Sequence, residues 1–171
     1  VELRSSALKL MQVIEGEKDP AFVEKIIRML TERTLDEIIA SEEIKAKLTP
    51  ILDEHWKTVE VIKQRSISER GVVSFDLTGT GIEGYNKFIP YYFHPEVTYV
   101  VSLSQSSFRT KISVGSNPWA PRPRVHNIAQ ICERYGGGGH AVVGAVSLKP
   151  EDLELGKQYM REIIEELRFE D

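Results

Sequence analysis

Four consecutive glycines, Gly136, Gly137, Gly138 and Gly139, are followed directly by His140. An ordered glycine gives up more backbone freedom than any other residue, by about 0.5–1 kcal/mol relative to alanine. Such a run is therefore either a linker or a place where the backbone must come close to something. Successive N–H groups with no Cβ in the way can converge on an anion, and the adjacent histidine can donate a hydrogen bond or carry charge. The alternative is a tight turn with a core-facing histidine.

The sequence on either side of the run argues against a linker. Residues 126–135, HNIAQICERY, have the pattern of a short amphipathic helix, and residues 141–149, AVVGAVSLK, have that of an apolar strand. Gly136 stands where a helix commonly ends in the left-handed conformation. We therefore expect Gly136 to act as a cap and the later glycines to form an anion site beside His140.

Basic residues are concentrated just before the glycines, although the chain as a whole carries a net charge of −4. Residues 106–140 contain a single acidic residue, Glu133. Arg109 is expected in the middle of a strand over residues 107–115, where a fixed guanidinium suits a bidentate grip on phosphate. The basic residues of this stretch are Arg109, Lys111, Arg122, Arg124 and Arg134.

Residues 116–124, SNPWAPRPR, contain three prolines and predict a stiff, irregular loop. Arg122 and Arg124 within it are secondary candidates for binding phosphate. Trp119 is placed to stack on a nucleobase.

The sequence contains few candidate catalytic residues. The four histidines lie far apart, and the motifs H-E-x-x-H, C-x-x-C and G-x-S-x-G are absent from the sequence. The chain has glycines and basic residues that can bind phosphate, but it has no recognisable group of residues that could activate water. We expect no catalytic residue and no metal site in it.

The elements that position these residues fall into two parts. Residues 1–70 read as helices, with Asp19 as an N-cap and a capping box at Thr34 to Glu37. From Gly71 onward the period changes to that of strands, which alternate with short helices. This order predicts an α/β domain over residues 71–171, with a mixed β-sheet of about four to five strands and flanking helices, preceded by a helical arm.

Bulk properties set limits on location and partners. The chain has 171 residues and a pI near 5.7, so it is not a globally basic protein that coats nucleic acid. A partner that carries phosphate would therefore have to bind to a local basic patch. The single cysteine, Cys132, suits a reducing cytoplasm. No run of about 18 apolar residues is present, so we expect no membrane partner and a cytoplasmic location.

A second glycine motif is a weaker candidate. Gly79, Gly81 and Gly84 spell G-x-G-x-x-G after a strand, as in a dinucleotide-binding fingerprint. Pro90 and Pro95 interrupt the region where the full helix of that fold would run. A glycine-rich turn is the favoured interpretation, and a nucleotide-cofactor domain ranks third among the functional hypotheses.

The segment HNIAQICERYGGGGHAVVGAVSL resembles the DHH-associated domain: a short helix with an Ile-Ala pair, the glycines and histidine, then a small-residue strand containing Gly144. The strand that carries Arg109 is similar to that family's arginine-bearing strand. The resemblance covers about residues 71–168. It departs from the family pattern at Val142 and Val143, where small residues are usual, which narrows that side of the expected pocket.

The resemblance implies the C-terminal substrate-binding domain of a DHH-type phosphoesterase. Relatives include nano-RNA and 3′-phosphoadenosine phosphate hydrolases, RecJ-type exonucleases, exopolyphosphatase-like proteins and a module of alanyl-tRNA synthetases. In this family an N-terminal domain with an Asp-His-His motif holds paired manganese or magnesium ions. This sequence has no such motif, so residues 1–70 are interpreted as the connector or tail of a catalytic domain that precedes Val1 or is absent.

The sequence thus predicts a chain that binds a phosphorylated small molecule or short single-stranded RNA or DNA and is not active alone. Phosphate is assigned to the backbone N–H groups of Gly137, Gly138 and Gly139, with His140 and Arg109. The rival hypothesis is a non-catalytic single-stranded nucleic-acid or tRNA-binding module. Short RNA, a bisphosphorylated nucleotide, a cyclic dinucleotide and polyphosphate all remain open as substrates, as does a homodimer.

Overall fold

The computed structural model describes residues 1–169 and divides the chain into two compact units. The first, Val1–Lys57, is helical, and the second begins at Thr58 and is α/β. The boundary lies within a long helix, α4 (Glu42–Arg65). No helix in the described part of the chain is long and apolar enough to cross a membrane.

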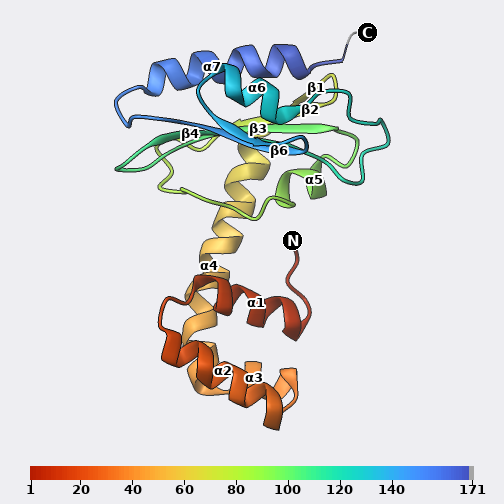
Figure 1. Ribbon diagram of the computed structural model, residues 1–171. Helices are drawn as coiled ribbons and strands as arrows, with labels where there is room; N and C mark the ends of the chain where they lie inside the picture. Colours follow the sequence, from red (N-terminus) through yellow and green to blue (C-terminus); the bar gives the residue numbers. More distant parts are fainter. Residues whose placement is uncertain (170–171) are drawn as a thin grey trace. The chain divides into compact units, whose positions relative to one another are not determined.

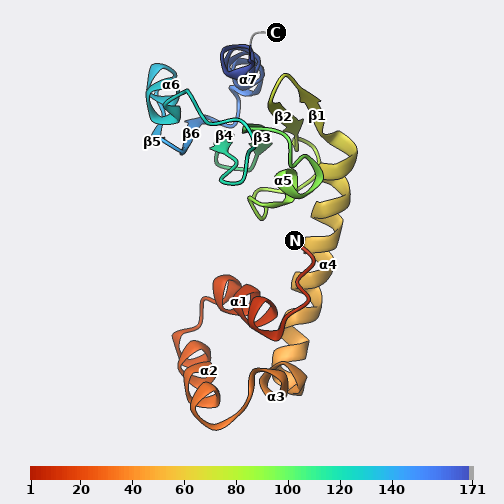
Figure 2. The same cartoon turned by 90° about the vertical axis from the view of Figure 1, so that its right-hand side faces the viewer.

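Three further helices, α1 (Ser6–Gly16), α2 (Pro20–Glu32) and α3 (Leu35–Ala40), belong to the helical unit (Figure 2). The predicted helix starts are confirmed. Asp19 accepts a hydrogen bond from the N–H of Ala21 at 3.0 Å, and Thr34 and Glu37 form a reciprocal capping box. Apolar side chains at helical spacing meet in one core, which consists of Leu10, Val13, Phe22, Ile26, Met29, Ile38, Ile44 and Leu48.

The α/β unit is built on a six-stranded mixed sheet with the order β1-β2-β3-β4-β6-β5. Only β2 and β3 run parallel, and the other neighbours are antiparallel. The strands are β1 (Ile67–Glu69), β2 (Val72–Asp76), β3 (Tyr99–Gln105), β4 (Thr110–Ser116), β5 (Gly138–His140) and β6 (Val143–Leu148).

The expected fold class is confirmed, with more strands than the four to five predicted. Both edge strands, β1 and β5, were missed, since each has only three residues. The sequence of β5, Gly-Gly-His, lacks the alternating apolar pattern of a strand. It is a strand because it pairs with β6, a contact that local sequence does not specify.

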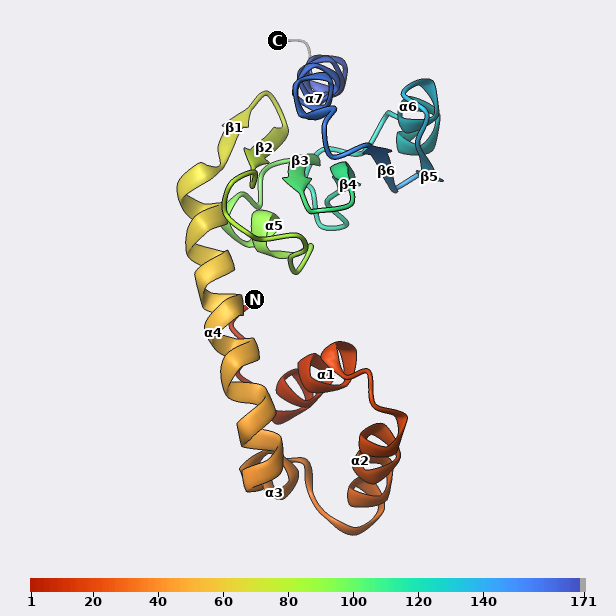
Figure 3. The same ribbon diagram turned by 90° about the vertical axis from the view of Figure 1, so that its left-hand side faces the viewer.

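Helices cover the two faces of the sheet unequally (Figures 1 and 3). The packed face lies under α6 (Ile128–Arg134) and α7 (Leu153–Leu167), whose apolar residues join the sheet in the largest core of the unit. The members of this core on the strands are Val72, Tyr99, Val101, Leu103, Ile112, Val114 and Val146.

The opposite face is covered over β2, β3 and the Gly115 end of β4. There α5 (Ile89–Phe93) and the segment before it pack on the strands. The ring of Tyr85 contacts that of Phe75 at 5.2 Å, and its hydroxyl lies 2.8 Å from that of Ser102. Burial raises the pKa of Tyr85 to about 12 despite this hydrogen bond. This part of the face is closed, and α5 also reaches β4, where a Cβ at Gly115 would lie 3.0 Å from the hydroxyl oxygen of Tyr91. Over β6 and β5, no helix of the described α/β unit lies against this face (Figure 3).

Candidate functional site

The first glycine of the run ends helix α6, as predicted. Gly136 has a φ of +77°, and its N–H donates to the carbonyl of Glu133 at 3.1 Å. The N–H of Gly137 donates to the carbonyl of Cys132 at 2.9 Å. These bonds satisfy carbonyls at the end of the helix. The N–H groups of both residues are thus used by the cap and are not free for an anion.

Two glycines are required by the close approach of strand β6. A Cβ at Gly137 would lie 2.1 Å from the carbonyl oxygen of Ala145, and one at Gly139 would lie 2.3 Å from that of Val143. Both contacts are with backbone, which cannot swing aside as a flexible side chain can. Gly144 on β6 is equally constrained, since its Cβ would lie 2.7 Å from the sulfur of Cys132.

Gly138 is different from its neighbours. Its φ is not positive, and a Cβ added to it would meet no atom of the described residues within 4 Å. Glycine in a strand costs about 0.5–1 kcal/mol relative to alanine, and here neither conformation nor packing requires it. A ligand that approaches the backbone closely is a physical reason for a glycine at this position.

The pairing register places Gly138 and His140 on the half of the sheet that no helix covers. Residues directly opposite each other in a sheet share a face, and Gly138 pairs with Ala145 and His140 with Val143. His140 is exposed, and Val143 is 48% exposed. The alternative of a core-facing histidine is therefore wrong.

We call this surface the open floor. Its members share the face of Gly138 by strand alternation, and most are small or polar: Lys111 and Ser113 on β4, Val143, Ala145 and Ser147 on β6, and Gly138 and His140 on β5. Gly115 on β4 shares this face but lies under the hydroxyl of Tyr91 and marks the border of the floor. The residues between them on β4 and β6 are buried in the packed face. Because β5 is an edge strand, its N–H groups that do not face β6 are open to a ligand.

The prediction that Arg109 lies in the middle of a strand is wrong. Arg109 immediately precedes β4, in the turn after β3, and its guanidinium lies 5.3 Å from the ring of the exposed Phe108. The sequence alternates from residue 107, but the turn closed by the 2.8 Å bond from the N–H of Ser106 to the carbonyl of Arg109 delays the strand.

The structure does not bring Arg109 to the glycines. His140 pairs with Val143, which pairs with Gly115 on β4. Gly115 is six residues beyond Arg109, which at about 3.3 Å per residue puts the two ends of the strand about 20 Å apart. Arg109 and His140 therefore cannot hold the same phosphate.

Lys111 was not predicted as a site residue, yet it lies on the open floor close to Arg109. Together with Glu83, Ser104 and Ser106, these two residues line a shallow depression at the far end of the floor. Partial burial, and to a lesser extent the charge of Arg109, lower the pKa of Lys111. The period-two alternation of Lys111, Ser113 and Gly115 was the signal that could have placed it on an exposed face.

Arg122 and Arg124 lie in the loop between β4 and α6, away from the open floor. Arg122 lines a separate pocket and packs over the ring of Phe169, with 4.5 Å from its guanidinium carbon to the ring centroid. Arg124 donates to the backbone carbonyl of His126. Arg134, at the end of α6, pairs with Glu166. The basic stretch is thus divided among several places rather than gathered at the glycines.

The described residues do not fit the paired metal ions that the resemblance implies. Across residues 1–169, no group of three or more His, Cys, Asp or Glu side chains is arranged to hold a metal ion. The segment from Gly79 to Gly84 forms turns, with φ of +74° at Gly79 and +77° at Gly81, and the next helix is the five-residue α5. The long helix of a dinucleotide-binding motif does not follow these glycines.

No protein-family model and no curated protein matches the sequence. Among solved structures, the pGpG-specific phosphodiesterase PggH from Vibrio cholerae aligns with a TM-score of 0.72 and 22% identity, over 86% of this chain and 51% of that one. An exopolyphosphatase-related protein from Bacteroides fragilis aligns at 0.44 and 14% identity, over 85% and 44%. The DHH domain of a protein described as a member of a ribosomal protein family aligns at 0.45 and 10%, over 74% and 34%.

Of these likenesses, only that to PggH is strong enough to indicate a shared fold. The likeness to PggH, a phosphodiesterase, agrees with the fold that the resemblance in the sequence implies. The chain spans about half of the length of PggH.

Proposed function

We propose that the α/β unit binds a phosphorylated nucleotide or a short single-stranded nucleic acid on the open floor, as the substrate-binding part of a DHH-type phosphoesterase. The observation that carries this proposal is Gly138, a strand glycine that neither conformation nor packing requires. The missing side chain leaves the backbone accessible at an edge strand, where an anion can approach the N–H groups.

The terminal phosphate is assigned to the backbone of β5 and to His140. The imidazole is exposed on the same face as Gly138, so it can donate a hydrogen bond to a phosphate oxygen there. Because the cap uses the N–H groups of Gly136 and Gly137, the donors in this segment are the N–H groups of β5 that do not pair with β6.

A second phosphate is assigned to Lys111 and Arg109 at the far end of the floor. From the border of the floor at Gly115, next to Tyr91 of α5, to Lys111 is four residues along β4, or about 13 Å. Between these ends lie the small residues Ser113 and Ala145, which leave room for sugar and base. PggH is specific for pGpG, which carries a terminal phosphate and one internal phosphodiester, and a ligand of this class supplies one phosphate group for each of the two assigned sites.

Hydrolysis is assigned to a part of the full-length protein other than this chain. The described residues assemble no metal site, so the manganese or magnesium ions implied by the resemblance would be held by an N-terminal DHH domain. With manganese added, we expect this chain alone to show no phosphodiesterase activity. Robust turnover that survives repurification would contradict the assignment.

Calorimetric titration with pGpG tests the binding site. We expect His140→Ala to weaken binding about tenfold, the loss of one charge-assisted hydrogen bond. Arg161→Ala, which removes an exposed cation from α7 on the packed side of the sheet, is the matched control and should leave the affinity unchanged. Equal affinities of the His140→Ala variant and the wild type would overturn the proposal.

The rival function, a non-catalytic single-stranded nucleic-acid or tRNA-binding module, is favoured by the exposure of two aromatic side chains. The side chain of Phe108, beside Arg109, is 64% exposed and that of Trp119 is 68% exposed, so both are able to stack on bases. This function predicts affinity that rises with strand length and falls steeply with salt. The phosphoesterase function predicts affinity set by a terminal phosphate and saturated at a few nucleotides.

A further inference from the structure

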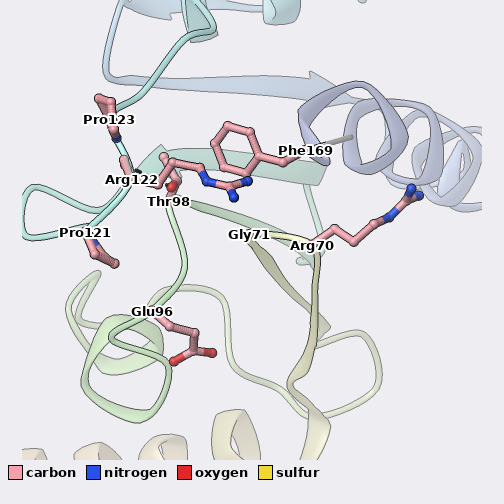
Figure 4. A pocket seen from close by; sticks show the side chains of 8 residues that line it. All are labelled: Arg70, Gly71, Glu96, Thr98, Pro121, Arg122, Pro123 and Phe169. Atoms are coloured by element: carbon pink, nitrogen blue, oxygen red, sulfur yellow. Dashed lines mark hydrogen bonds between the residues drawn. The ribbon is translucent and has the colours of Figure 1, made fainter. Parts of the chain in front are cut away.

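A cavity of about 650 Å³ lies at the end of the sheet where β2 and β3 begin, and nothing in the proposed phosphate site uses it. Its walls come from the loop between β4 and α6, from the segment before β3, and from Phe169 just after α7 (Figure 4). Counted across β3, β4, β6 and β5, it is three strand spacings, or about 14 Å, from the glycines of β5.

One wall of the cavity is the guanidinium of Arg122, which is held flat. The backbone of Arg122 is fixed between Pro121 and Pro123, and its carbonyl accepts a hydrogen bond from the hydroxyl of Thr98 at 3.1 Å. The guanidinium lies against the ring of Phe169 (Figure 4). Within residues 1–169 it has no acidic partner and no hydrogen-bond acceptor, so its second flat side and its donors face the cavity.

Phe169 is itself held in place by its contacts. Its N–H donates to the carbonyl of Arg70 at 3.0 Å, and its ring rests on Gly71, where a Cβ would lie 2.4 Å from a ring carbon. The ring of the fully buried Tyr99 lies 5.9 Å away. The stack of Phe169 and Arg122 is therefore a built platform rather than two loose surface side chains.

The opposite wall carries a carboxylate, that of Glu96 (Figure 4). Its Oε1 accepts from the hydroxyl of Ser68 at 3.1 Å and lies 3.5 Å from Nδ1 of His94. No described residue donates a hydrogen bond to Oε2. The charge of Arg70, also on the wall, is engaged by Glu165 at 3.7 Å and is directed away from the platform (Figure 4).

We propose that this cavity binds the guanine base of a nucleotide. The base stacks on the free side of the Arg122 guanidinium, an arrangement that proteins use for unpaired bases. Its Watson–Crick edge then faces Glu96, where N1–H and the 2-amino group both donate to the carboxylate. Adenine presents an acceptor at N1, which an acceptor-only carboxylate cannot satisfy. The site selects the base and does not depend on where the phosphate is bound.

Binding of GMP, IMP and AMP, which carry the same phosphate, isolates the contribution of the base. We expect GMP to bind about tenfold or more tightly than AMP, as one bidentate base contact allows, and IMP, without the 2-amino group, to lie between them. Equal affinities for the three nucleotides would overturn the proposal, as would competition by inorganic phosphate at concentrations similar to GMP.

Variants separate this cavity from the open floor. Glu96→Gln should reduce the ratio of GMP to AMP affinity to near one, and Arg122→Ala should weaken both nucleotides. His140→Ala, at the separate phosphate site, should change neither the affinities of the mononucleotides for this cavity nor their ratio, and Arg161→Ala is the control that changes neither. If Glu96→Gln keeps the GMP preference, the carboxylate does not read the base and the proposal is wrong. Failure of the proposed phosphate site appears instead in the separate titration with pGpG, as an affinity of the His140→Ala variant equal to that of the wild type.

Discussion

The two sides of the β5–β6 ribbon use glycine for opposite reasons. On the packed side, Gly139 and Gly144 are required because backbone or the buried Cys132 occupies the space of a Cβ. On the open side, Gly138 has free space around it and an ordinary φ. A single glycine run thus combines residues that the fold needs with a residue that it does not need, and only the latter points to a ligand.

This comparison yields a criterion that composition does not provide. A glycine is structural when it caps a helix or when a Cβ at its position would clash with neighbouring atoms. A glycine with an ordinary φ and free space around it is a candidate for contact with a ligand. The same reasoning separates the closed half of the face opposite α6 and α7, where Tyr85 and α5 cover β2 and β3, from the open floor.

Gly139→Ala should have the largest effect on stability. The added methyl would meet the carbonyl of Val143, and overpacking of this kind costs about 1–3 kcal/mol. Urea denaturation measures the loss of unfolding free energy. Gly138→Ala is the matched control and should change it by less than about 1 kcal/mol, and in the stabilising direction. Equal losses in the two variants would remove the distinction between the two sides.

Gly138→Ala should instead weaken binding. A methyl on the open side blocks the approach of a phosphate to the backbone, and we expect the affinity for pGpG to fall about tenfold, which corresponds to about 1.4 kcal/mol. Calorimetry on the folded variant measures this. An affinity equal to that of the wild type would show that the space beside Gly138 is not used.

Alkaline pH should destabilise the packed side. Burial, and then the charge of Glu133, raise the pKa of the Cys132 thiol to about 11 from an ordinary value of 9.0. The unfolded state therefore loses its proton first, and this contribution to stability is complete below pH 9 and is lost as the pH rises towards 11. Denaturation curves at about pH 8 and about pH 10.5 measure the decline, which Cys132→Ala should reduce. An unchanged decline in that variant would assign it to other groups.

Lys111→Ala should have the smallest effect, limited to ligands with a second phosphate. The affinity for pGpG should fall a few-fold, and the slope of log affinity against log salt should decrease by about 1. GMP, with one phosphate, is the control ligand. A similar loss for GMP would place Lys111 at the terminal phosphate instead.

Local signals in the sequence were enough for much of the fold. Asp19, Thr34 and Gly136 predicted helix ends because capping is a property of a few adjacent residues. The strands expected over residues 107–115 and 141–149 correspond to β4 and β6, although β4 begins later than expected. The two edge strands were not predicted, because β1 and β5 are strands by virtue of their partners rather than their own sequence.

The candidate site was predicted less completely. The phosphate site at the glycines and His140 stays a prediction, and Arg109 was grouped with them because proximity in sequence was taken for proximity in space. The register of β4 against β6 sets these residues about 20 Å apart, and register depends on pairing over the whole sheet. The cavity at Arg122 and Glu96 joins segments far apart in the chain, so no local pattern could have shown it.

Backbone amide NMR during titration with pGpG tests the central claim most directly. We predict that the perturbed amides cluster on the open floor, with the largest shifts at Gly138, Gly139 and His140 and smaller shifts at Lys111 and Ser113. The amides of α7 on the packed side should stay in place. Shifts concentrated on α7, with those of β5 unchanged, would contradict the assignment of the open floor as the phosphate-binding surface.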